Sequence, residues 1–479
     1  MKREGEERMT ILSNFNILKY MESFNDFLYT YILIVLLVLL GIFFTYKTKF
    51  VQFRYIKEMF RLLGDGDSSD KKDGTVSSFQ AFCISTSSRV GTGNLAGIAI
   101  ALSVGGPGAI FWMWIMALLG AASSFVESTL AQIYKEKDES GAYRGGPAYY
   151  IEKGLKKKWL GVLFSILITL SFGLIFNSVQ SNTIAAAVNE AFGFNKTVVG
   201  IILMILTLVI IIGGVQRIAK FSGVIVPIMA GLYILVALFI VVKNITLIPS
   251  IIVLIVKSAF GLNEFIGGTL GGIMLIGIKR GLFSNEAGMG SAPNAAATAT
   301  VSHPVKQGLI QTLSVFNDTI IICTCTAFII LVSGIDLSGD LTGIQLTQKA
   351  LTSEIGSFGS IFIAICIFLF AFSSIIGNYY YGETNIEFLT KKKIYLTAYR
   401  IAVGLMVFFG SVASLGLVWT LADISMAFMA IVNLIAITLL GKYAFKALDD
   451  YRAQKKAGIK DPVFKASNIP GLEDITEWD

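Results

Sequence analysis

The residues best suited to bind a small charged ligand lie in two glycine-rich stretches inside apolar segments. One reads Ser85-Thr-Ser-Ser-Arg-Val-Gly-Thr-Gly-Asn-Leu-Ala-Gly97, and the other reads Gly267-Gly-Thr-Leu-Gly-Gly-Ile-Met-Leu-Ile-Gly-Ile-Lys-Arg-Gly281. Such composition favours an interrupted helix, whose free N–H groups suit a carboxylate and whose free carbonyls suit Na⁺ or an ammonium group. The alternative, strongest for the second stretch, is close packing of helices through small residues.

Residues for covalent or metal chemistry are few. The single histidine, His303, lies in a polar turn, where we expect it to be exposed and inert. The four cysteines (Cys83, Cys323, Cys325 and Cys366) lie in apolar stretches without metal-ligand or disulfide spacing, which is typical of small packing residues. The sequence contains no Walker motif, and residues 91–97 lack the spacing of a nucleotide-binding loop. We therefore expect neither an enzyme nor an ATP-driven pump.

Composition indicates that membrane helices position these stretches. The 479 residues are 54% hydrophobic and 15% charged, more apolar than a soluble protein requires. The apolar runs are long enough for helices that cross about 30 Å of hydrocarbon. They predict an all-α membrane protein of about eleven transmembrane helices, at 27–46, 77–103, 107–133, 159–188, 197–214, 221–242, 263–290, 308–333, 356–381, 395–415 and 420–441. The first run is too long for a cleavable signal, so we expect a retained helix.

Charge distribution predicts the orientation. With the N-terminus outside, the inward-facing stretches hold 30 of the 39 Lys and Arg residues and the outward-facing stretches hold 8. This bias predicts a cytoplasmic C-terminus. The formal charge of +7 then reflects contact with an anionic inner leaflet rather than nucleic acid.

The number of helices favours an internal repeat. If the first helix is peripheral, ten remain, and five plus five is the count of an inverted repeat with two interrupted helices. We expect residues 1–76 to hold the peripheral helix and an amphipathic interfacial helix at 49–63. The two repeats would occupy 77–242 and 243–441, the second preceded by an outer interfacial segment at 246–258, and a cytoplasmic tail would occupy 442–479. The interruptions would lie near residue 90 and near Ile276.

Three motifs resemble one known family. Ser88-Arg-Val-Gly-Thr-Gly-Asn94, Gly145-Gly-Pro-Ala-Tyr-Tyr150 and Gly277-Ile-Lys-Arg-Gly-Leu-Phe-Ser-Asn-Glu-Ala-Gly-Met-Gly-Ser-Ala-Pro293 look like the alanine or glycine:cation symporter family. The resemblance covers about residues 25 to 450. It implies a prokaryotic carrier that moves alanine or glycine with Na⁺, with a fold similar to that of the bacterial leucine transporter.

The same resemblance implies a substrate and sodium site. Because Val90-Gly-Thr-Gly-Asn94 is similar to the break in the first core helix of that fold, the amides of Thr92 and Gly93 would bind the substrate carboxylate next to Asn94. The implied sodium ligands are the carbonyls of Ser87, Val90 and Phe370 with the hydroxyls of Ser373 and Ser374. Five oxygens without a carboxylate suit a monovalent cation. The alternative for the two serines is back-bonding within their own helix.

A second sodium site would use Asn94 and Asn317 by the same resemblance. Arg89 lies among these positions, and its positive charge disfavours an adjacent cation, so we expect one Na⁺ per cycle. Five other charges lie within predicted spans: Glu127, Lys279, Arg280, Glu286 and Asp318. We expect most of these to face the cytoplasmic vestibule and form gate or scaffold ion pairs.

The remaining expected pocket residues come from three helices. Phe172 and Phe176 share one face of helix 159–188 and would cap a small cavity, unless they are ordinary core or lipid-facing residues. Asn177 and Gln180 lie on a neighbouring strip. The expected substrate set also includes Gln80 and Cys83 before the first interruption, and Gly272, Ile276 and Gly277 at the second.

These observations predict a secondary active transporter that carries alanine or glycine into the cell with Na⁺ by alternating access. We expect it in a prokaryotic plasma membrane, with the lipid bilayer, the amino acid and Na⁺ as its partners and no nucleic acid or obligatory protein partner. The alternative is a proton-coupled or exchange-type carrier of the same fold. Paired helix interruptions disfavour a channel, whereas a receptor that binds without transport stays open.

Overall fold

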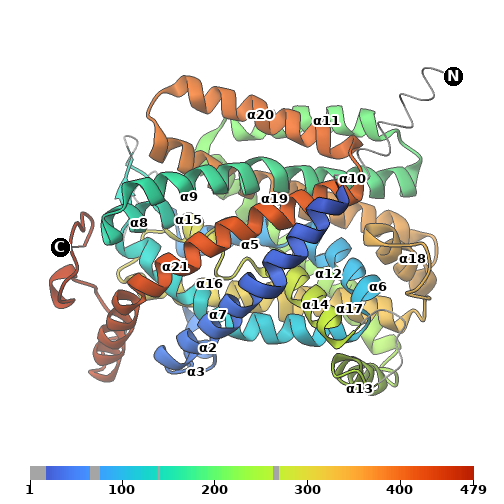
Figure 1. Ribbon diagram of the computed structural model, residues 1–479, viewed down its shortest axis with the longest axis horizontal. Coiled ribbons are helices and arrows are strands. Elements are labelled where there is room, and N and C mark those ends of the chain that lie inside the picture. Colours follow the sequence, from blue (N-terminus) through green and yellow to red (C-terminus); the bar gives the residue numbers. More distant parts are fainter. Residues whose placement is uncertain (1–17, 65–75, 139–140, 263–268, 479) are drawn as a thin grey trace.

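The computed structural model describes residues 18–64, 76–138, 141–262 and 269–478. Helices form one bundle, with α18 at one end and α8 and the C-terminal segment at the opposite end (Figure 1). Within the described residues, eight helices are long and apolar enough to cross a membrane. This confirms the prediction of an all-α membrane protein.

The chain enters the bundle through one long helix, Leu18–Lys47, whose second part is α2 (Ile34–Lys47). The predicted amphipathic helix follows as two short pieces, α3 (Val51–Arg54) and α4 (Ile56–Gly64). The structure thus confirms helical structure at 49–63, with a break at Tyr55.

The first predicted repeat begins with an interrupted helix. Its elements are α5 (Ser78–Arg89), the π-turn η2 (Gly93–Gly97), α6 (Ile98–Gly105), α7 (Gly108–Ile133), α9 (Lys158–Leu170), η3 (Ser171–Phe176), α10 (Asn177–Phe192), α11 (Lys196–Ile211) and α12 (Gly214–Lys243). Between α7 and α9, where the sequence suggested only a loop, the chain forms a hairpin of β1 (Glu136–Lys137) and β2 (Tyr143–Arg144) and then α8 (Pro147–Leu155).

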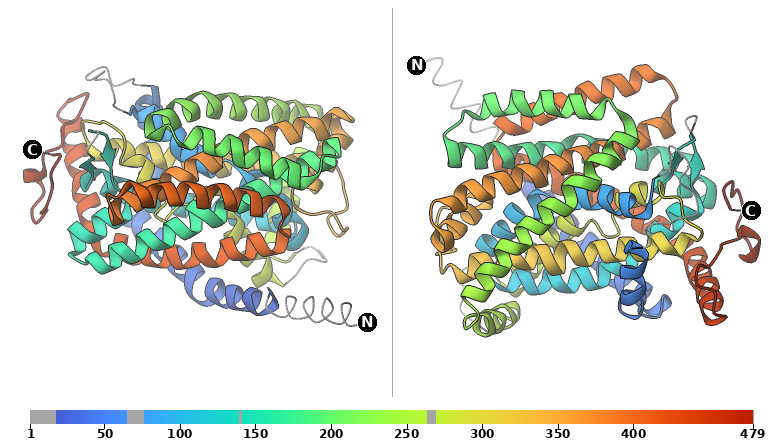
Figure 2. Two further views of the ribbon diagram at one scale, coloured as in Figure 1. Left: turned by 90° about the horizontal axis from the view of Figure 1, so that it is seen from above. Right: turned by 180° about the vertical axis from the view of Figure 1, so that it is seen from behind.

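The second predicted repeat follows α13 (Ile248–Ala259), so most of the segment 246–258 is helical; its interfacial position stays a prediction. Its elements are α14 (Leu270–Asn285), α15 (Ala292–Ala296), α16 (Pro304–Val315), η4 (Phe316–Cys323), α17 (Thr324–Val332), α18 (Gly343–Ile355), α19 (Phe358–Leu389), α20 (Lys393–Val412) and α21 (Leu415–Lys456). α11 and α20 pack side by side along one edge of the bundle (Figures 1 and 2).

α5 lies at the centre of the bundle (Figure 1), where α12, α16 and α19 pack against it. It begins with a capping box, because Ser77 and Gln80 exchange side-chain and backbone hydrogen bonds. Its hydroxyl groups are buried, and those of Ser85 and Ser87 donate to carbonyls three residues earlier in the same helix. The helix can therefore be polar without exposing unsatisfied groups to lipid.

The C-terminal segment folds back onto the end of the bundle that carries α8. The indole N–H of Trp478 donates to the Gln132 carbonyl at 2.8 Å, and the ring of Phe464 lies 5.1 Å from that of His303. His303 is fully buried, with Nε2 3.2 Å from Asp450 Oδ2. Our expectation of an exposed histidine was wrong, because the turn that carries it is covered by residues more than 140 positions away along the chain.

Candidate functional site

The first interruption lies where the sequence predicted it, between α5 and η2. Val90 leaves the helix in an extended conformation, with ψ of 93°, and every residue from Ser85 to Gly97 is buried. Glycine at position 91 allows this close approach, because a methyl group here would overlap Ser374 Oγ and lie 2.7 Å from Gln180 Oε1. The interruption is therefore enclosed by α10 and α19.

Two successive amides of the interruption point to side-chain oxygens. The Gly91 N–H donates to Asn94 Oδ1 at 2.8 Å, and the Thr92 N–H donates to Gln180 Oε1 at 2.9 Å. Thr92 Oγ1 is buried and makes no hydrogen bond within the described residues. Gln180 Oε1 occupies a position that a substrate carboxylate oxygen could take, since either oxygen can accept a hydrogen bond from the Thr92 N–H. Gln180 would have to move when such a ligand binds.

Three of the five implied sodium ligands meet at one hydroxyl. Ser374 Oγ lies 3.3 Å from the Val90 carbonyl oxygen and 3.0 Å from the Phe370 carbonyl oxygen. One hydroxyl has a single proton, so it cannot satisfy both carbonyls at the same time. A cation at this point would coordinate all three oxygens, which is the chemistry that Na⁺ prefers.

The other two implied ligands are the Ser373 hydroxyl and the Ser87 carbonyl. Ser373 Oγ donates to the Phe370 carbonyl at 2.8 Å, the back-bonding that we gave as the alternative role of both serines. The Ser87 hydroxyl donates to Ile84 O at 2.7 Å and accepts from Ser222 at 3.2 Å. Ser222 belongs to α12, and sequence analysis did not find it because its segment carries no distinctive motif.

Asn94 faces Asp318 rather than Asn317. Asn94 Nδ2 donates to Asp318 Oδ1 at 2.7 Å, and the hydroxyls of Ser284 and Thr319 donate to Asp318 Oδ2 at 2.7 and 2.8 Å. The residue that meets Asn94 is thus Asp318, and not Asn317, which the resemblance implied for the disfavoured second sodium site. Asp318 lies in the π-helical η4 (Phe316–Cys323), whose wider turn changes which residues face the bundle interior.

An aromatic stack covers one side of the first interruption. The rings of Phe172 and Phe176 stack at 4.3 Å, Phe176 stacks on Phe283 at 4.7 Å, and Phe283 packs on Trp419 at 4.5 Å. A methyl group at Gly93 would lie 3.1 Å from the Phe283 ring. Phe172 and Phe176 are therefore buried next to the interruption, and not lipid-facing.

Two members of this stack, Phe283 and Trp419, were not predicted from the sequence. Phe283 lies within the family-like run 277–293, which was a usable signal. Trp419 lies near the start of α21, and nothing in its local sequence distinguishes it from a membrane-interface residue.

Five expected substrate residues lie apart from this cluster. Gln80 caps the start of α5, ten residues or about 15 Å before Val90, and Cys83 is buried two turns before the interruption. A methyl group at Gly277 would overlap Ala109 of α7 and lie 2.8 Å from Trp112 Cβ, so Gly277 serves helix packing. Ile276 packs against Gly105, and the Gly272 N–H caps the start of α14 by donating to Thr269.

The second interruption lies at residues 286–291, not near Ile276. The structure describes a continuous α14 through Ile276, and the backbone then turns at Glu286, Gly288 and Gly290, which all have positive φ. The glycines of α14 that we read as a break allow contact with α7 instead. Gly267 and Gly268 lie outside the described residues.

A carboxylate of the chain occupies the amides of the second interruption. The N–H groups of Gly288 and Gly290 donate to Glu127 Oε1 and Oε2, each at 3.1 Å, and Asn433 Nδ2 donates to Oε2 at 2.8 Å. Glu127 is fully buried in α7. The first interruption therefore has amides that only neutral oxygens accept, whereas the second is already satisfied by an acid.

The basic residues of α14 pair with aspartates of two other helices. Lys279 Nζ lies 2.8 Å from Asp26 Oδ1 of the first helix. Arg280 pairs with Asp423 of α21, and its guanidinium lies 4.5 Å from the centre of the Trp419 ring. Both residues form ion pairs, as expected for these charges, and their place relative to the cytoplasmic vestibule stays a prediction.

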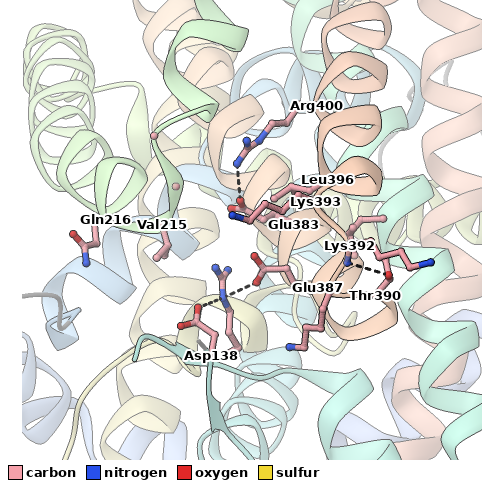
Figure 3. A pocket seen from close by; sticks show the side chains of 15 residues that line it. Asp138, Val215, Gln216, Glu383, Glu387, Thr390, Lys392, Lys393, Leu396 and Arg400 are labelled. Atoms are coloured by element: carbon pink, nitrogen blue, oxygen red, sulfur yellow. Dashed lines mark hydrogen bonds and ion pairs between the residues drawn. The ribbon is translucent and has the colours of Figure 1, made fainter. Parts of the chain in front are cut away.

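A separate cavity of 370 Å³ lies where α19 ends and α20 begins. Figure 3 shows Asp138 and Glu387 pointing toward each other. Arg144 Nε lies 3.0 Å from Asp138 Oδ2 and 2.9 Å from Glu387 Oε2. Arg400 lies 3.3 Å from Glu383 on the same wall. None of the six intramembrane charges singled out in the sequence lines this cavity. Glu383 lies nine residues beyond Ser374 on α19, which places the cavity about 14 Å along that helix from the implied sodium ligands.

The chain is similar to known transporters along nearly its whole length. The sodium:alanine symporter family matches residues 14–466. The amino-acid carrier protein AlsT of Bacillus subtilis (strain 168) is 58% identical over 95% of this chain and 96% of its own length. The probable sodium/glutamine symporter GlnT of the same organism is 59% identical over 95% and 94%.

A solved structure supports the fold. The crystal structure of MhsT in complex with L-phenylalanine covers 85% of this chain and 94% of its own chain, with a TM-score of 0.51 and 17% identity. At this identity the likeness concerns the fold alone. It confirms the expected leucine-transporter-like architecture.

Proposed function

This chain belongs to the sodium:alanine symporter family, and on this premise we propose that it carries alanine or glycine into the cell together with one Na⁺. The chain is a multi-pass membrane transporter that couples amino acid movement to sodium, and it is not an enzyme. The further proposal is that transport occurs by alternating access across a prokaryotic plasma membrane. Its N-terminus would be outside, and the units 77–242 and 243–441 would form the inverted repeat.

The observation that carries the proposal is that backbone N–H groups and backbone carbonyls, both without partners in a helix, lie close together at the first interruption. Amides at Thr92 and Gly93 would bind the substrate carboxylate, with Gln180 leaving the Thr92 N–H. The carbonyl of Val90, two residues earlier, would bind Na⁺ together with Ser374 and Phe370. Because the same short segment supplies both sets, sodium that orders the carbonyls also prepares the amides, which is a coupling free energy.

The complete proposed ligand set extends this core. The Ser87 carbonyl would complete the sodium site. The Ser373 hydroxyl would join it after turning away from the Phe370 carbonyl. Asn94 would position the amides, because it accepts the Gly91 N–H while Asp318 holds its other end. Gln80, Cys83, Gly272, Ile276 and Gly277 no longer belong to the proposed substrate site.

The aromatic stack supports a small substrate. Phe176, Phe283 and Trp419 are nearly fully buried and pack ring against ring next to Gly93. A ligand whose carboxylate lies at Thr92 would direct its side chain toward these rings, where a methyl group meets favourable apolar surface. Glutamine is the competing substrate, since GlnT is named a sodium/glutamine symporter. Its amide would need a hydrogen-bond partner among these rings.

Uptake into proteoliposomes tests the substrate and the ion together. We expect saturable uptake of alanine and glycine, weaker uptake of glutamine, and loss of uptake when choline replaces Na⁺. Full alanine uptake without Na⁺, driven by a pH gradient, would instead support the proton-coupled or exchange-type carrier. Preferred uptake of glutamine would contradict the proposed small pocket.

One substitution tests the sodium site. Ser374→Ala removes the hydroxyl at which the carbonyls of Val90 and Phe370 meet, so half-saturating Na⁺ should rise more than the alanine Kd at saturating Na⁺. The control is Ser411→Ala, which removes a buried hydroxyl that donates only within α20, to Val407 at 3.0 Å. Unchanged sodium dependence of the Ser374 variant would place the ion elsewhere.

A further inference from the structure

A single carboxylate joins the two interrupted helices. Ser88, in the last turn of α5, donates to Glu286 Oε1 at 2.8 Å. Glu286 is the first residue of the second interruption and has a left-handed conformation, with φ of 55°. Its other oxygen accepts from Ser291 at 2.6 Å, where that interruption ends. Glu286 therefore spans the second interruption and holds the end of α5 next to it.

The same serine also contacts α19, the helix that carries the proposed sodium ligands Ser373 and Ser374. Ser88 Oγ lies 2.6 Å from the side-chain oxygen of Asn378, one turn beyond Ser374. Since a hydroxyl donates one proton, it goes to the stronger acceptor, the carboxylate. Asn378 can then turn its otherwise unpartnered Nδ2 toward Ser88. With the Asn378 amide turned in this way, hydrogen bonds connect Asn378 to Ser88 and Ser88 to Glu286.

The helices approach closely enough for this chain to be rigid. A methyl group at Gly377 would lie 2.8 Å from Ser87 Oγ and 2.9 Å from the Ser88 nitrogen. Because the two helices are close-packed here, a movement of Ser87 and Ser88 requires a movement of α19. A movement of α19 likewise requires a movement of these two residues.

Charge balance gives Glu286 a second role. The five proposed sodium ligands include no carboxylate, and a cation buried without a counter-charge is costly. Glu127 is engaged by the amides of Gly288 and Gly290, and Asp318 is engaged by Asn94. Glu286 is 1% exposed and interacts electrostatically with Arg89 and Asp318. The Ser88 hydroxyl connects it to the end of α5, whose carbonyls would bind the ion.

We propose that Glu286 is a positioning residue for sodium coupling, which acts through Ser88 to tie the second interruption to the end of α5 and to α19. The inference rests on the sodium site proposed above. Na⁺ bound at the carbonyls of Ser87 and Val90 fixes the end of α5, so the hydrogen bond from Ser88 holds the second interruption in the matching position. The two interrupted helices then respond to one ion as a unit.

The test measures binding of radiolabelled alanine to the purified transporter across a Na⁺ titration. Ser88→Ala breaks the link but keeps the charge, Glu286→Gln removes the charge, and Ser88→Thr keeps the hydroxyl. Ser411→Ala is the control, because it removes a buried hydroxyl that donates within α20 and lies outside the proposed link. Ser374→Ala serves as the reference for loss of a direct ligand.

We expect Ser88→Ala and Glu286→Gln to raise half-saturating Na⁺ about tenfold, the size expected for loss of one hydrogen bond to a charged group. The alanine Kd at saturating Na⁺ should change less than about threefold, a split that a general loss of folding would not give. Ser88→Thr should keep the sodium dependence of the wild type, and Ser411→Ala should leave it unchanged.

The outcomes distinguish a failure of the role of Glu286 from a failure of the proposed sodium site. If Ser374→Ala raises half-saturating Na⁺ and Ser88→Ala does not, the role of Glu286 is overturned while the sodium site stands. If Ser374→Ala itself has no effect, the proposed site fails and this inference fails with it. Should Glu286→Gln not fold, the comparison of Ser88→Ala with Ser88→Thr decides alone.

Discussion

Adding a single methyl group at Gly91 tests whether the first interruption is the coupled site. Gly91 lies outside the left-handed region, so alanine meets no backbone penalty there. The new methyl carbon would overlap Ser374 Oγ, and it would lie 2.7 Å from Gln180 Oε1 and 3.2 Å from Ser374 Cβ. Ser374 and Gln180 must therefore move apart, on the order of 1 Å, to reach ordinary contact distances.

The expected cost follows from the overlap. Overpacking of this kind costs about 1–3 kcal/mol, which corresponds to about 5- to 150-fold in an equilibrium constant. The displaced group is the hydroxyl that contacts Val90 and Phe370, so half-saturating Na⁺ for alanine uptake should rise about tenfold or more. Gln180 moves away from the Thr92 N–H in the same variant, which weakens the positioning of the amides.

Gly97→Ala provides the matched control in the same segment. A methyl group there lies 3.4 Å from Trp419 and 3.8 Å from the Thr92 carbonyl oxygen, which is ordinary contact. The assay is sodium-dependent uptake of radiolabelled alanine in proteoliposomes, with size-exclusion profiles to confirm folding. A folded Gly91→Ala transporter with wild-type sodium dependence would refute the assignment of this interruption as the shared site.

Three further outcomes follow from other contacts. Gln180→Glu would place a permanent carboxylate at the Thr92 N–H, so alanine binding should fall strongly while the protein keeps its melting temperature; normal binding would mean that Thr92 is not the cradle. Glu127→Ala leaves two buried N–H groups unsatisfied and should lower the free energy of unfolding by about 2–5 kcal/mol, whereas Glu127→Gln should lower it less. Equal melting temperatures of the Glu127→Ala variant and the wild type would contradict this role. Burial lowers the pKa of His303 below its usual value of about 6.5, so the docked C-terminal segment holds a neutral imidazole. As pH falls below about 6.5, the undocked form binds the proton more readily, and proteolysis of the segment should increase; His303→Gln should abolish that dependence, and its persistence would assign it to another group.

The first interruption could be predicted because its signal is local. Ser, Thr, Arg and Asn surrounded by apolar residues cannot form an ordinary lipid-facing helix, whatever packs against them. The structure accordingly breaks α5 at Val90, as expected. The second interruption was misplaced because glycine serves packing and breaks equally well. In α14, Gly277 makes room for Ala109 and Trp112 of α7, whereas Gly288 and Gly290 turn the backbone toward Glu127.

The pairing of side chains depended on helix geometry that the sequence does not state. Asn317 and Asp318 are neighbours in sequence, and only the π-helical turns of η4 decide that Asp318 meets Asn94. His303 was misjudged for a related reason, since the residues that bury it, Asp450 and Phe464, come from the C-terminal part of the chain.

The sequence by itself determined that this protein is a bundle of membrane helices, that its polar centre lies at residues 85–97 and that its family is a sodium-coupled one. These properties depend on composition, on charge bias and on contiguous motifs, all of which are local along the chain. Only the tertiary structure decided which groups meet the free backbone of each interruption: Gln180 and Ser374 at the first, Glu127 at the second, and Glu286 with Ser88 between them. Hydrogen bonds act over about 3 Å, and residues about 90 to 290 positions apart reach that distance only when the helices pack.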